Sequence, residues 1–338
     1  MQDCGGNGAG FSALASTFGE EGDANADFVA GASGAIGLRL VPLLVTAGHQ
    51  VTGLIRSQSK AEPLQRAGAT PVVVDALDPP ALRKAVMDAQ PEVVVHEMTA
   101  LANASDLRHF DRAFAQTNRL RTEGLDHLLA AAREAAARRV VAQSYCGWPF
   151  ARVGGPVKTE DDPLDAAPPR EFERSLQAIR HLESAVAEAT DFDGTVLRYG
   201  SFYGPGSGLF DGPALDQLRR RLFPVIGDGG GWWSFLHLDD AAEATACAIE
   251  TGASGIYNIV DDDPAPVRDW LPALATMIGA KPPRHIPRWL ARFVAGEHMV
   301  VMMTESRAGS NAKARRELGW RPNHASWRQG FAEVLASA

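Results

Sequence analysis

Two kinds of hydrophobic pattern alternate along the chain from residue 27 onward. Short apolar runs rich in Val and Ile predict buried strands, and longer stretches with apolar residues three or four positions apart predict amphipathic helices. Their alternation is typical of a doubly wound parallel sheet built from βαβ units. The expected strands are residues 27–30, 51–55, 72–74, 92–95, 139–143, 194–197 and 256–260, and the expected long helices are 122–137 and 172–189.

The pattern changes after residue 197. Glycine-rich and aromatic segments, followed by proline-rich and methionine-rich segments, predict loops and short helices above a binding site. We therefore expect a nucleotide-binding domain formed by 26–199 and 234–262, with a smaller, interleaved substrate lobe formed by 200–233 and 263–325. Residues 1–25 are rich in Gly, Ala and Ser and lack Lys and Arg, so a flexible tail is expected rather than a signal peptide.

Composition narrows the class of protein. With 45% hydrophobic and 22% charged residues, the chain matches an ordinary globular protein. The net charge of −8 and the scattered basic residues argue against a nucleic-acid partner, and no apolar run reaches the ~18 residues of a membrane span. Three widely spaced cysteines without a CxxC pair favour a reducing, cytoplasmic location. No histidine or cysteine spacing predicts a metal site.

A glycine-rich segment lies directly between the first expected strand and the helix that follows it. Glycines there let the backbone approach a dinucleotide pyrophosphate, and the helix N-terminus offers free N–H groups to an anion. A glycine triplet also occurs in ordinary turns, but its place in a βαβ unit favours a Rossmann cofactor site. The candidate residues of this segment are Gly31, Ser33, Gly34, Ala35, Ile36 and Gly37.

The end of the second strand indicates which nicotinamide cofactor the site prefers. An acidic residue there selects NAD, but this chain has Arg56 and Ser57, with Lys60 nearby. These side chains suit a 2′-phosphate, so the cofactor is expected to be NADP(H); the alternative is a solvated arginine. Asp75, with Ala76 beside it, is placed to contact the adenine after the third strand, although a simple turn aspartate is nearly as good an interpretation.

The motifs together resemble those of extended short-chain dehydrogenases/reductases, the superfamily that includes sugar-nucleotide epimerases and dehydratases. The matching segments run from Phe28 to Pro322 and include FVAGASGAIG, VVVDALD, EVVVHEMTAL, TNRLRTEGLDHLLAAA, RVVAQS, TVLRYGSFYGPG, FLHLDDAAEA, GIYNIVDD and NAKARRELGWRP. The resemblance implies a Rossmann fold. It also implies cofactor contacts from Ser144 and from the segment after strand 194–197, at Arg198, Tyr199, Gly200 and Phe202.

The same resemblance implies a Ser or Thr after the fifth strand and a Tyr-x-x-x-Lys pair on the next helix. Ser144 fits the first position, with Tyr145 the alternative occupant; both are candidate catalytic residues, and the pKa of Tyr145 is expected to stay near ~10 without a lysine. The pair is missing, because its expected positions fall near Ser175 and Ile179. Sugar epimerisation and dehydration need that base, so those activities are disfavoured.

Aromatic residues dominate the expected entrance to the site. Trp232 and Trp233 stand where sugar-nucleotide enzymes usually carry an arginine, and they offer stacking area without charge pairing. The candidate substrate-binding residues are Trp148, Phe210, Trp232, Trp233 and Met302. For any one of them, packing in the core of the smaller lobe is an equally good interpretation.

These features together predict NADPH-dependent reduction of a ketone on an aromatic, polyketide-like small molecule, with the proton supplied by Tyr145, Ser144, water or the substrate itself. The narrower similarity is to angucyclinone-type ketoreductases of antibiotic biosynthesis that lack the usual tyrosine. The alternatives are a non-catalytic NADP(H)-sensing protein and, third, a sugar-nucleotide epimerase or dehydratase. A monomer or homodimer is expected.

Overall fold

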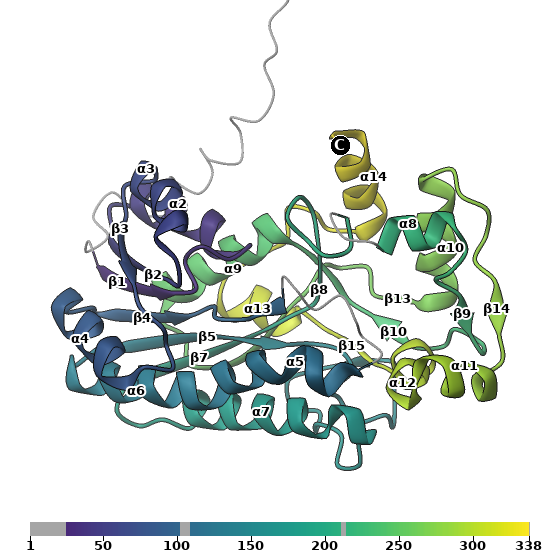
Figure 1. The fold of residues 1–338 in the computed structure, drawn as a ribbon, viewed down its shortest axis with the longest axis horizontal. Helices are drawn as coiled ribbons and strands as arrows, with labels where there is room; N and C mark the ends of the chain where they lie inside the picture. Colours follow the sequence, from purple (N-terminus) through teal and green to yellow (C-terminus); the bar gives the residue numbers. More distant parts are fainter. Residues whose placement is uncertain (1–24, 102–108, 211–213, 338) are drawn as a thin grey trace, which may run out of the picture.

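A computed structural model describes residues 25–101, 109–210 and 214–337. The expected tail thus lies outside the described residues, except for Asn25. The central sheet has seven parallel strands in the order β12-β7-β5-β4-β1-β2-β3 (Figure 1). Every expected strand is present, which confirms the doubly wound Rossmann architecture. The strands are β1 Ala26–Ala30, β2 Gln50–Ile55, β3 Thr70–Val73, β4 Val93–His96, β5 Arg139–Tyr145, β7 Asp193–Tyr199 and β12 Gly255–Ile259.

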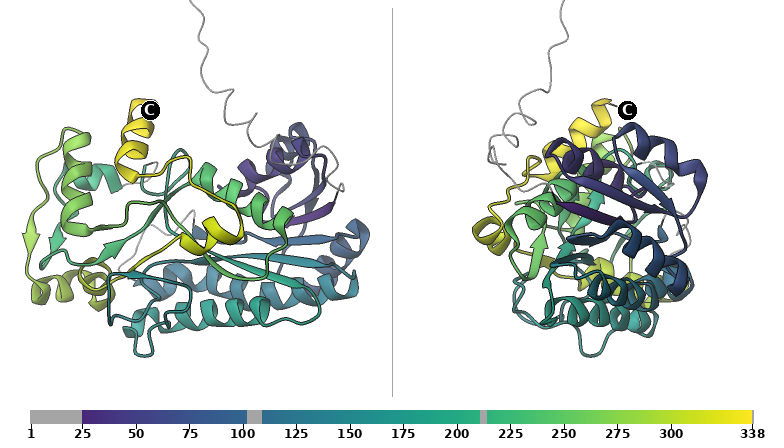
Figure 2. Two further views of the ribbon diagram at one scale, coloured as in Figure 1. Left: turned by 180° about the vertical axis from the view of Figure 1, so that it is seen from behind. Right: turned by 90° about the vertical axis from the view of Figure 1, so that its left-hand side faces the viewer.

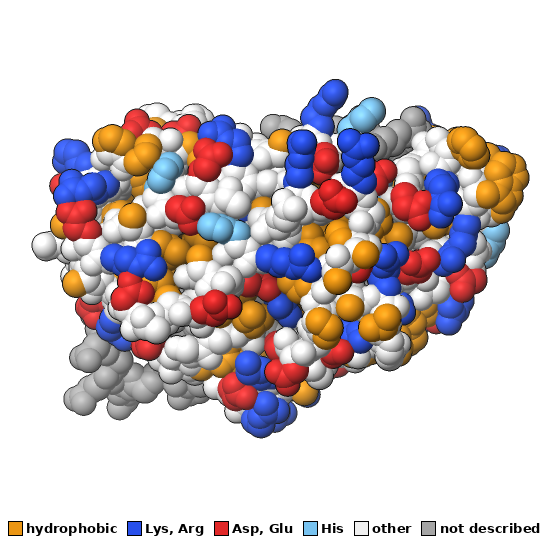
Figure 3. Space-filling view, turned by 90° about the horizontal axis from the view of Figure 1, so that it is seen from below, with side chains coloured by type: hydrophobic (Ala, Val, Ile, Leu, Met, Phe, Trp, Pro, Cys, Tyr) orange, Lys and Arg blue, Asp and Glu red, His pale blue; other side chains and the backbone are white. Residues whose placement is uncertain are grey.

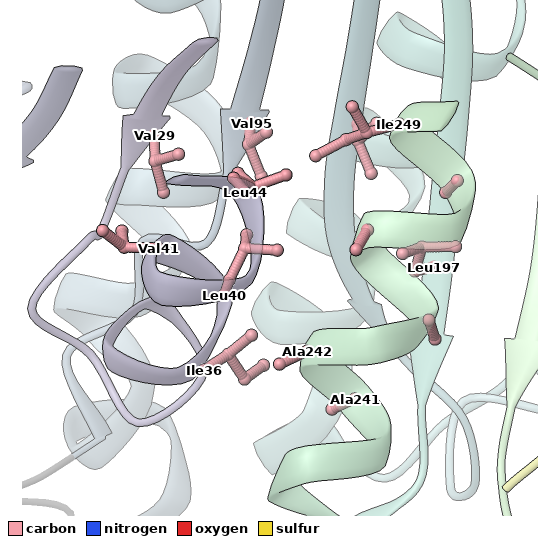
Figure 4. Close-up of a cluster of buried hydrophobic side chains, with 14 of the residues drawn as sticks. Val29, Ile36, Leu40, Val41, Leu44, Val95, Leu197, Ala241, Ala242 and Ile249 are labelled. Carbon is pink, nitrogen blue, oxygen red and sulfur yellow. The ribbon is translucent and has the colours of Figure 1, made fainter. Parts of the chain in front are cut away.

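Helices cover both faces of this sheet, and successive strand residues alternate between the two. In β1, Val29 packs on one face, whereas Phe28 and Ala30 pack on the other. The continuous apolar runs therefore reflect strands buried on both sides. The first face is covered by α2 Gly37–Thr46, α3 Ala61–Arg66, α9 Leu238–Thr251 and α13 Ala312–Glu317; Figure 4 shows α2 and α9 meeting there. The second is covered by α4 Pro79–Ala89, α6 Leu125–Glu134 and α7 Arg170–Ala187.

The helix expected at 122–137 is part of a longer one. α5 Phe110–Arg119 continues through a π-helical turn, Leu120–Gly124, into α6. A π-helical turn carries wider hydrogen-bond loops than an α-helix and frequently marks a functional site. The carbonyl of Leu120 in this turn is bonded by the His96 ring, with Nε2 3.1 Å from the oxygen. α5 and α7 run side by side below the sheet (Figures 1 and 2).

A smaller lobe stands beyond the carboxyl ends of the strands, at the right of Figure 1. Its core joins Trp270 of α10 to Trp327 and Phe331 of the C-terminal helix α14. Its elements are α8 Ala214–Arg219, β9 Val225–Ile226, β10 Trp232–Trp233, β13 Ala265–Pro266, α10 Val267–Met277, β14 His285–Ile286, α11 Arg288–Ala295, α12 Glu297–Thr304 and α14 Trp327–Ser337. Short segments elsewhere are η1 Gln58–Lys60, β6 Val157–Lys158, β8 Ser201–Tyr203, β11 Phe235–His237 and β15 Ala308–Gly309.

The expected lobe boundary at residue 325 needs correction. Ala314, Leu318 and Trp320, which the sequence pattern assigned to the smaller lobe, pack with α2 and α9 on the sheet of the large domain. Conversely, α14 follows residue 325 and joins the core of the smaller lobe. The lobes were assigned from the change in sequence pattern after residue 197. The chain crosses between the two lobes more often than that pattern indicates.

The surface view in Figure 3 shows acidic and basic side chains interspersed over the lower face. Hydrophobic side chains gather at its right-hand end, the end where α11 lies in Figure 1. Among the described residues, no helix is both long and apolar enough to cross a membrane.

Candidate active site

The glycine-rich segment forms a tight turn between β1 and α2. Gly31 has a φ of +101°, and a Cβ placed there would lie 2.6 Å from the carbonyl oxygen of Glu97. A Cβ on Gly37 would lie 2.5 Å from the Gly31 carbonyl oxygen, while the Gly34 N–H donates to that same oxygen at 2.9 Å. Only glycine fits at 31 and 37. The bare backbone at the start of α2 leaves space of the kind that a dinucleotide pyrophosphate requires, and the assignment of residues 31–37 to it stays a prediction.

Arg39 holds this turn in place, and sequence reasoning missed it. Its guanidinium donates to the Ala35 carbonyl at 2.8 Å, to the Pro205 carbonyl at 2.6 Å, and to the Asp239 carboxylate at 2.5 Å. One side chain therefore ties the glycine turn to the loop after β8 and to the N-terminus of α9. Only the tertiary fold reveals this role of Arg39, because Pro205 and Asp239 lie far from it in the sequence.

Arg56 and Ser57 lie at the exposed carboxyl end of β2. Ser57 caps the short helix η1, whose last residue is Lys60. Among the described residues Arg56 has no ion-pair partner, so the guanidinium is available to a 2′-phosphate. At the end of β3, exposed Asp75 accepts a hydrogen bond from the Leu77 N–H at 3.0 Å, which is the turn role expected as its alternative, and Ala76 is buried.

The sequence predicted cofactor contacts from Arg198 and Tyr199, but the structure directs both side chains into the protein interior. The Arg198 guanidinium donates to both carboxylate oxygens of Glu183, at 2.7 and 2.6 Å. The Tyr199 hydroxyl is fully buried, where it donates to Glu97 at 3.0 Å and lies 2.6 Å from Thr245 Oγ1. These two polar groups thus serve the interior instead of a cofactor surface. Gly200 and half-buried Phe202, which packs against Tyr199, remain candidates.

Ser144 and Tyr145 follow each other at the end of β5 but face different surroundings. The Ser144 hydroxyl donates to Glu183 at 2.7 Å and is completely enclosed, so it belongs to the buried network with Arg198. The Tyr145 hydroxyl lies 3.2 Å from Ser201 Oγ beside a pocket. Burial raises the pKa of Tyr145 to about 12, above the ~10 expected from sequence. Tyr145 is therefore a neutral hydrogen-bonding group at physiological pH.

A pocket between the two lobes brings together most of the expected substrate-binding residues. The empty space in and in front of it amounts to about 220 Å³, a volume that includes open solvent at the entrance. The Trp233 indole donates to the Met302 carbonyl at 3.0 Å, which fixes the tryptophan on α12. The pocket residues are Tyr145, Cys146, Gly147, Trp148, Ser201, Trp232, Trp233, Ser234, Met302 and Ser306. Phe210 is not among them, because its ring packs against Phe331 in the core of the smaller lobe.

The positions expected for the tyrosine and lysine carry no acid or base. Ser175 is fully buried and its hydroxyl accepts a hydrogen bond from the Asn118 amide at 3.0 Å. Ile179, one helical turn further along α7, is buried in an aromatic cluster with Phe110, Trp148 and Phe172. In the part of the chain that the structure describes, no group of three or more His, Cys, Asp or Glu side chains is arranged to hold a metal ion.

Comparison with known proteins agrees with the motifs. The model of the NAD dependent epimerase/dehydratase family matches residues 28–260. A Streptomyces protein named 3-diazoavenalumate denitrifying reductase is 47% identical, over 90% of this chain and 98% of that protein. A Stigmatella aurantiaca ketoreductase that acts on 4-hydroxy-2-methyl-3-oxo-4-farnesyl-3,4-dihydroquinoline-1-oxide is 29% identical, over 87% of this chain and 91% of that protein.

The fold is shared with solved structures as well. The UDP-glucose 4-epimerase of Thermus thermophilus, solved as a complex with NAD, superposes with a TM-score of 0.68 at 24% identity and covers 92% of this chain and 97% of that one. With the family model matching most of the chain and a 47% identical relative matching nearly all of it, this protein belongs to the NAD dependent epimerase/dehydratase family.

Proposed function

We propose that the protein is an NADPH-dependent reductase of secondary metabolism that delivers a hydride to an aromatic small molecule carrying a diazo group, with release of N₂. The observation that carries the proposal is the pair Ser175 and Ile179, which replaces the acid–base pair of the family with a buried hydroxyl and a hydrocarbon. The 47% identity to the denitrifying reductase, over almost the full length of both chains, supports the same choice of substrate.

The chemistry explains why such a site can work without a proton donor. The bound cofactor supplies a hydride, and when a hydride replaces N₂ on an aryl diazonium cation, the products are an arene C–H bond and dinitrogen, with atoms and charge balanced. No proton is taken up at the reacting carbon. A ketone, by contrast, gains both a hydride and a proton, and a positioned acid contributes ~10²–10⁴-fold to such a step. A diazo acceptor therefore suits the residues present.

The chain's own residues supply cofactor binding and substrate orientation. The turn at Gly31 and Gly37 leaves room for the pyrophosphate, and Arg56 with Ser57 suits the 2′-phosphate that distinguishes NADPH from NADH. Trp148, Trp232 and Trp233 give the pocket flat apolar surfaces suited to stacking on an aromatic ring.

Reduction of an aromatic ketone is the second candidate. Two observations favour it: the ketoreductase relative, and the Tyr145 hydroxyl, which stands beside the pocket with Ser201 as its hydrogen-bond partner. In that reaction Tyr145, or a neighbouring hydroxyl of the substrate, would give the proton.

The test uses diazotised 3-amino-4-hydroxybenzoate and NADPH deuterated at the transferable position of the nicotinamide. We expect one N₂ released per NADPH oxidised, with deuterium at the ring carbon that carried nitrogen. Tyr145→Phe should change this rate by less than ~10-fold, because no proton is required. NADPH binding without oxidation, with this substrate and with aromatic ketones, would instead support a cofactor sensor. Oxidation only with aromatic ketones, together with a ~10²-fold or larger loss in Tyr145→Phe, would favour ketone reduction.

A further inference from the structure

Arg121 is a buried arginine whose charge has no partner. Its residue is 4% exposed and lies in the π-helical turn between α5 and α6. Two other arginines are also buried, and each is bonded: Arg198 to Glu183, and Arg139 to the Ile249 carbonyl. Among the described residues Arg121 forms neither a hydrogen bond nor an ion pair, and its Nε is completely enclosed without a partner. The two terminal nitrogens of Arg121 are not among the completely enclosed atoms. Part of the small exposed surface of Arg121 therefore belongs to them.

The one carboxylate that interacts electrostatically with Arg121 among the described residues forms no bond to it. Glu183 attracts it electrostatically, but both Glu183 oxygens are already bonded, to Arg198 and to the Ser144 hydroxyl. Arg121 therefore lies in the electrostatic field of Glu183 without a direct bond to it. Burial lowers the pKa of Arg121 only to about 10, so the side chain stays charged at neutral pH. An unpaired buried charge costs several kcal/mol, and the fold keeps this one.

The surroundings of Arg121 connect it with the pocket between the lobes. It interacts electrostatically with Tyr145, which lines the pocket, and it follows Asn118, which is bonded to Ser175, by about one helical turn. The π-helical turn packs against α7, the helix that carries Ile179 where the family has its lysine. Arg121 therefore brings a positive charge within electrostatic range of Glu183 on α7 and of Tyr145 at the pocket, although it is not itself among the residues that line the pocket.

We propose that Arg121 is an anion-binding residue of the active site, and that its partner is the carboxylate of the aromatic substrate. The proposal rests on the proposed function, since it assigns a substrate group to a charge at that site. A guanidinium pairs with a carboxylate through two parallel hydrogen bonds, and in a dry site such a pair is strong. The Streptomyces relative is named for a substrate that is itself a carboxylate, which agrees with this class of ligand.

The test measures binding without turnover. Protein loaded with NADP⁺ is titrated calorimetrically with 4-hydroxycinnamate and with its uncharged methyl ester. The wild-type protein should bind the acid at least ~10-fold more tightly than the ester, and Arg121→Met should lose this preference, while Arg121→Lys keeps part of it. Arg119→Met is the matched control, because Arg119 lies on the same helix but is exposed and paired with Glu123. It should behave as the wild type does.

Thermal unfolding separates binding from a structural role. Because Arg121→Met removes an unpaired buried charge and keeps an unbranched side chain, its Tm should equal or exceed that of the wild type. A Tm lower by several degrees, or an unchanged preference for the acid in Arg121→Met, would overturn the proposal. Since no turnover is involved, failure to release N₂ would count against the proposed function alone, and a missing acid preference against Arg121 alone.

Discussion

The amide of Asn118 donates a hydrogen bond to Ser175 Oγ, 3.0 Å away, across the interface between α5 and α7. Ser175 stands where the family's tyrosine is expected. A neutral hydrogen bond thus occupies the position from which the family's tyrosine would donate its proton. The consequence is a site that combines a tight glycine turn and an aromatic pocket with the loss of the usual acid. Reactions that need a hydride without a proton fit such a site best.

Arg56 should set the preference for NADPH over NADH. We expect the wild-type protein to bind NADPH at least ~10-fold more tightly than NADH, because the exposed guanidinium at the end of β2 can pair with the 2′-phosphate. Arg56→Ala should reduce that ratio and leave NADH binding almost unchanged. Calorimetry with both cofactors measures it, with Arg66→Ala, an exposed arginine on α3, as the control. Equal affinities in the wild-type protein would contradict the assignment.

Gly31→Ala should abolish cofactor binding. The new methyl group would lie 2.6 Å from the Glu97 carbonyl oxygen, at a φ of +101° that alanine rarely adopts. Such backbone strain costs on the order of 1–3 kcal/mol, and relieving it would displace the turn that receives the pyrophosphate. Fluorescence titration with NADPH and thermal unfolding test this, with Gly155→Ala as the control because an added Cβ meets no atom there. Unimpaired NADPH binding in Gly31→Ala would show that the pyrophosphate binds elsewhere.

Glu183→Gln should destabilise the fold severely. The substitution keeps the side chain's shape but leaves the buried guanidinium groups of Arg198 and Arg121 without a negative charge. Breaking a buried pair from one side costs ~3–5 kcal/mol. Chemical denaturation measures the loss, and Glu62→Gln, in an exposed pair with Arg66, should change stability by less than ~1 kcal/mol. Similar stability of the two variants would mean that the buried network contributes nothing.

Stability should fall as the pH rises through about 9. Burial lowers the pKa of His49, but hydrogen bonds to Asp27 at 2.6 Å and Glu250 at 2.8 Å outweigh it and raise the pKa from 6.5 to about 9. The stabilisation is complete below pH 6.5, where the unfolded chain is also protonated, and is lost as His49 deprotonates in the native state. The rise corresponds to roughly 3 kcal/mol. Denaturation curves between pH 6.5 and 9.5 should therefore slope downward, and those of His49→Gln should be flatter; equal slopes would refute the role of His49.

The sequence by itself determined the architecture and the cofactor turn. Seven short runs rich in apolar residues mark the strands, the central ones such as β4 are buried throughout, and this hydrophobicity is a local property of the sequence. Gly31 and Gly37 were recognisable because strand, glycine turn and helix are contiguous in the sequence. The absence of a tyrosine–lysine pair was equally readable, since the pair is defined by its spacing along one helix.

Only the tertiary structure decided which polar groups face the site, because that depends on partners distant in the sequence. Arg198 and Tyr199 looked like cofactor contacts, yet Glu183 and Glu97 bind them in the interior. Trp233 and Met302, 69 residues apart, form one wall of the pocket, whereas Phe210 packs elsewhere. The unpaired charge of Arg121 has no signature in the sequence at all, since an arginine's burial and its lack of partners follow from how α5, α7 and β5 pack together.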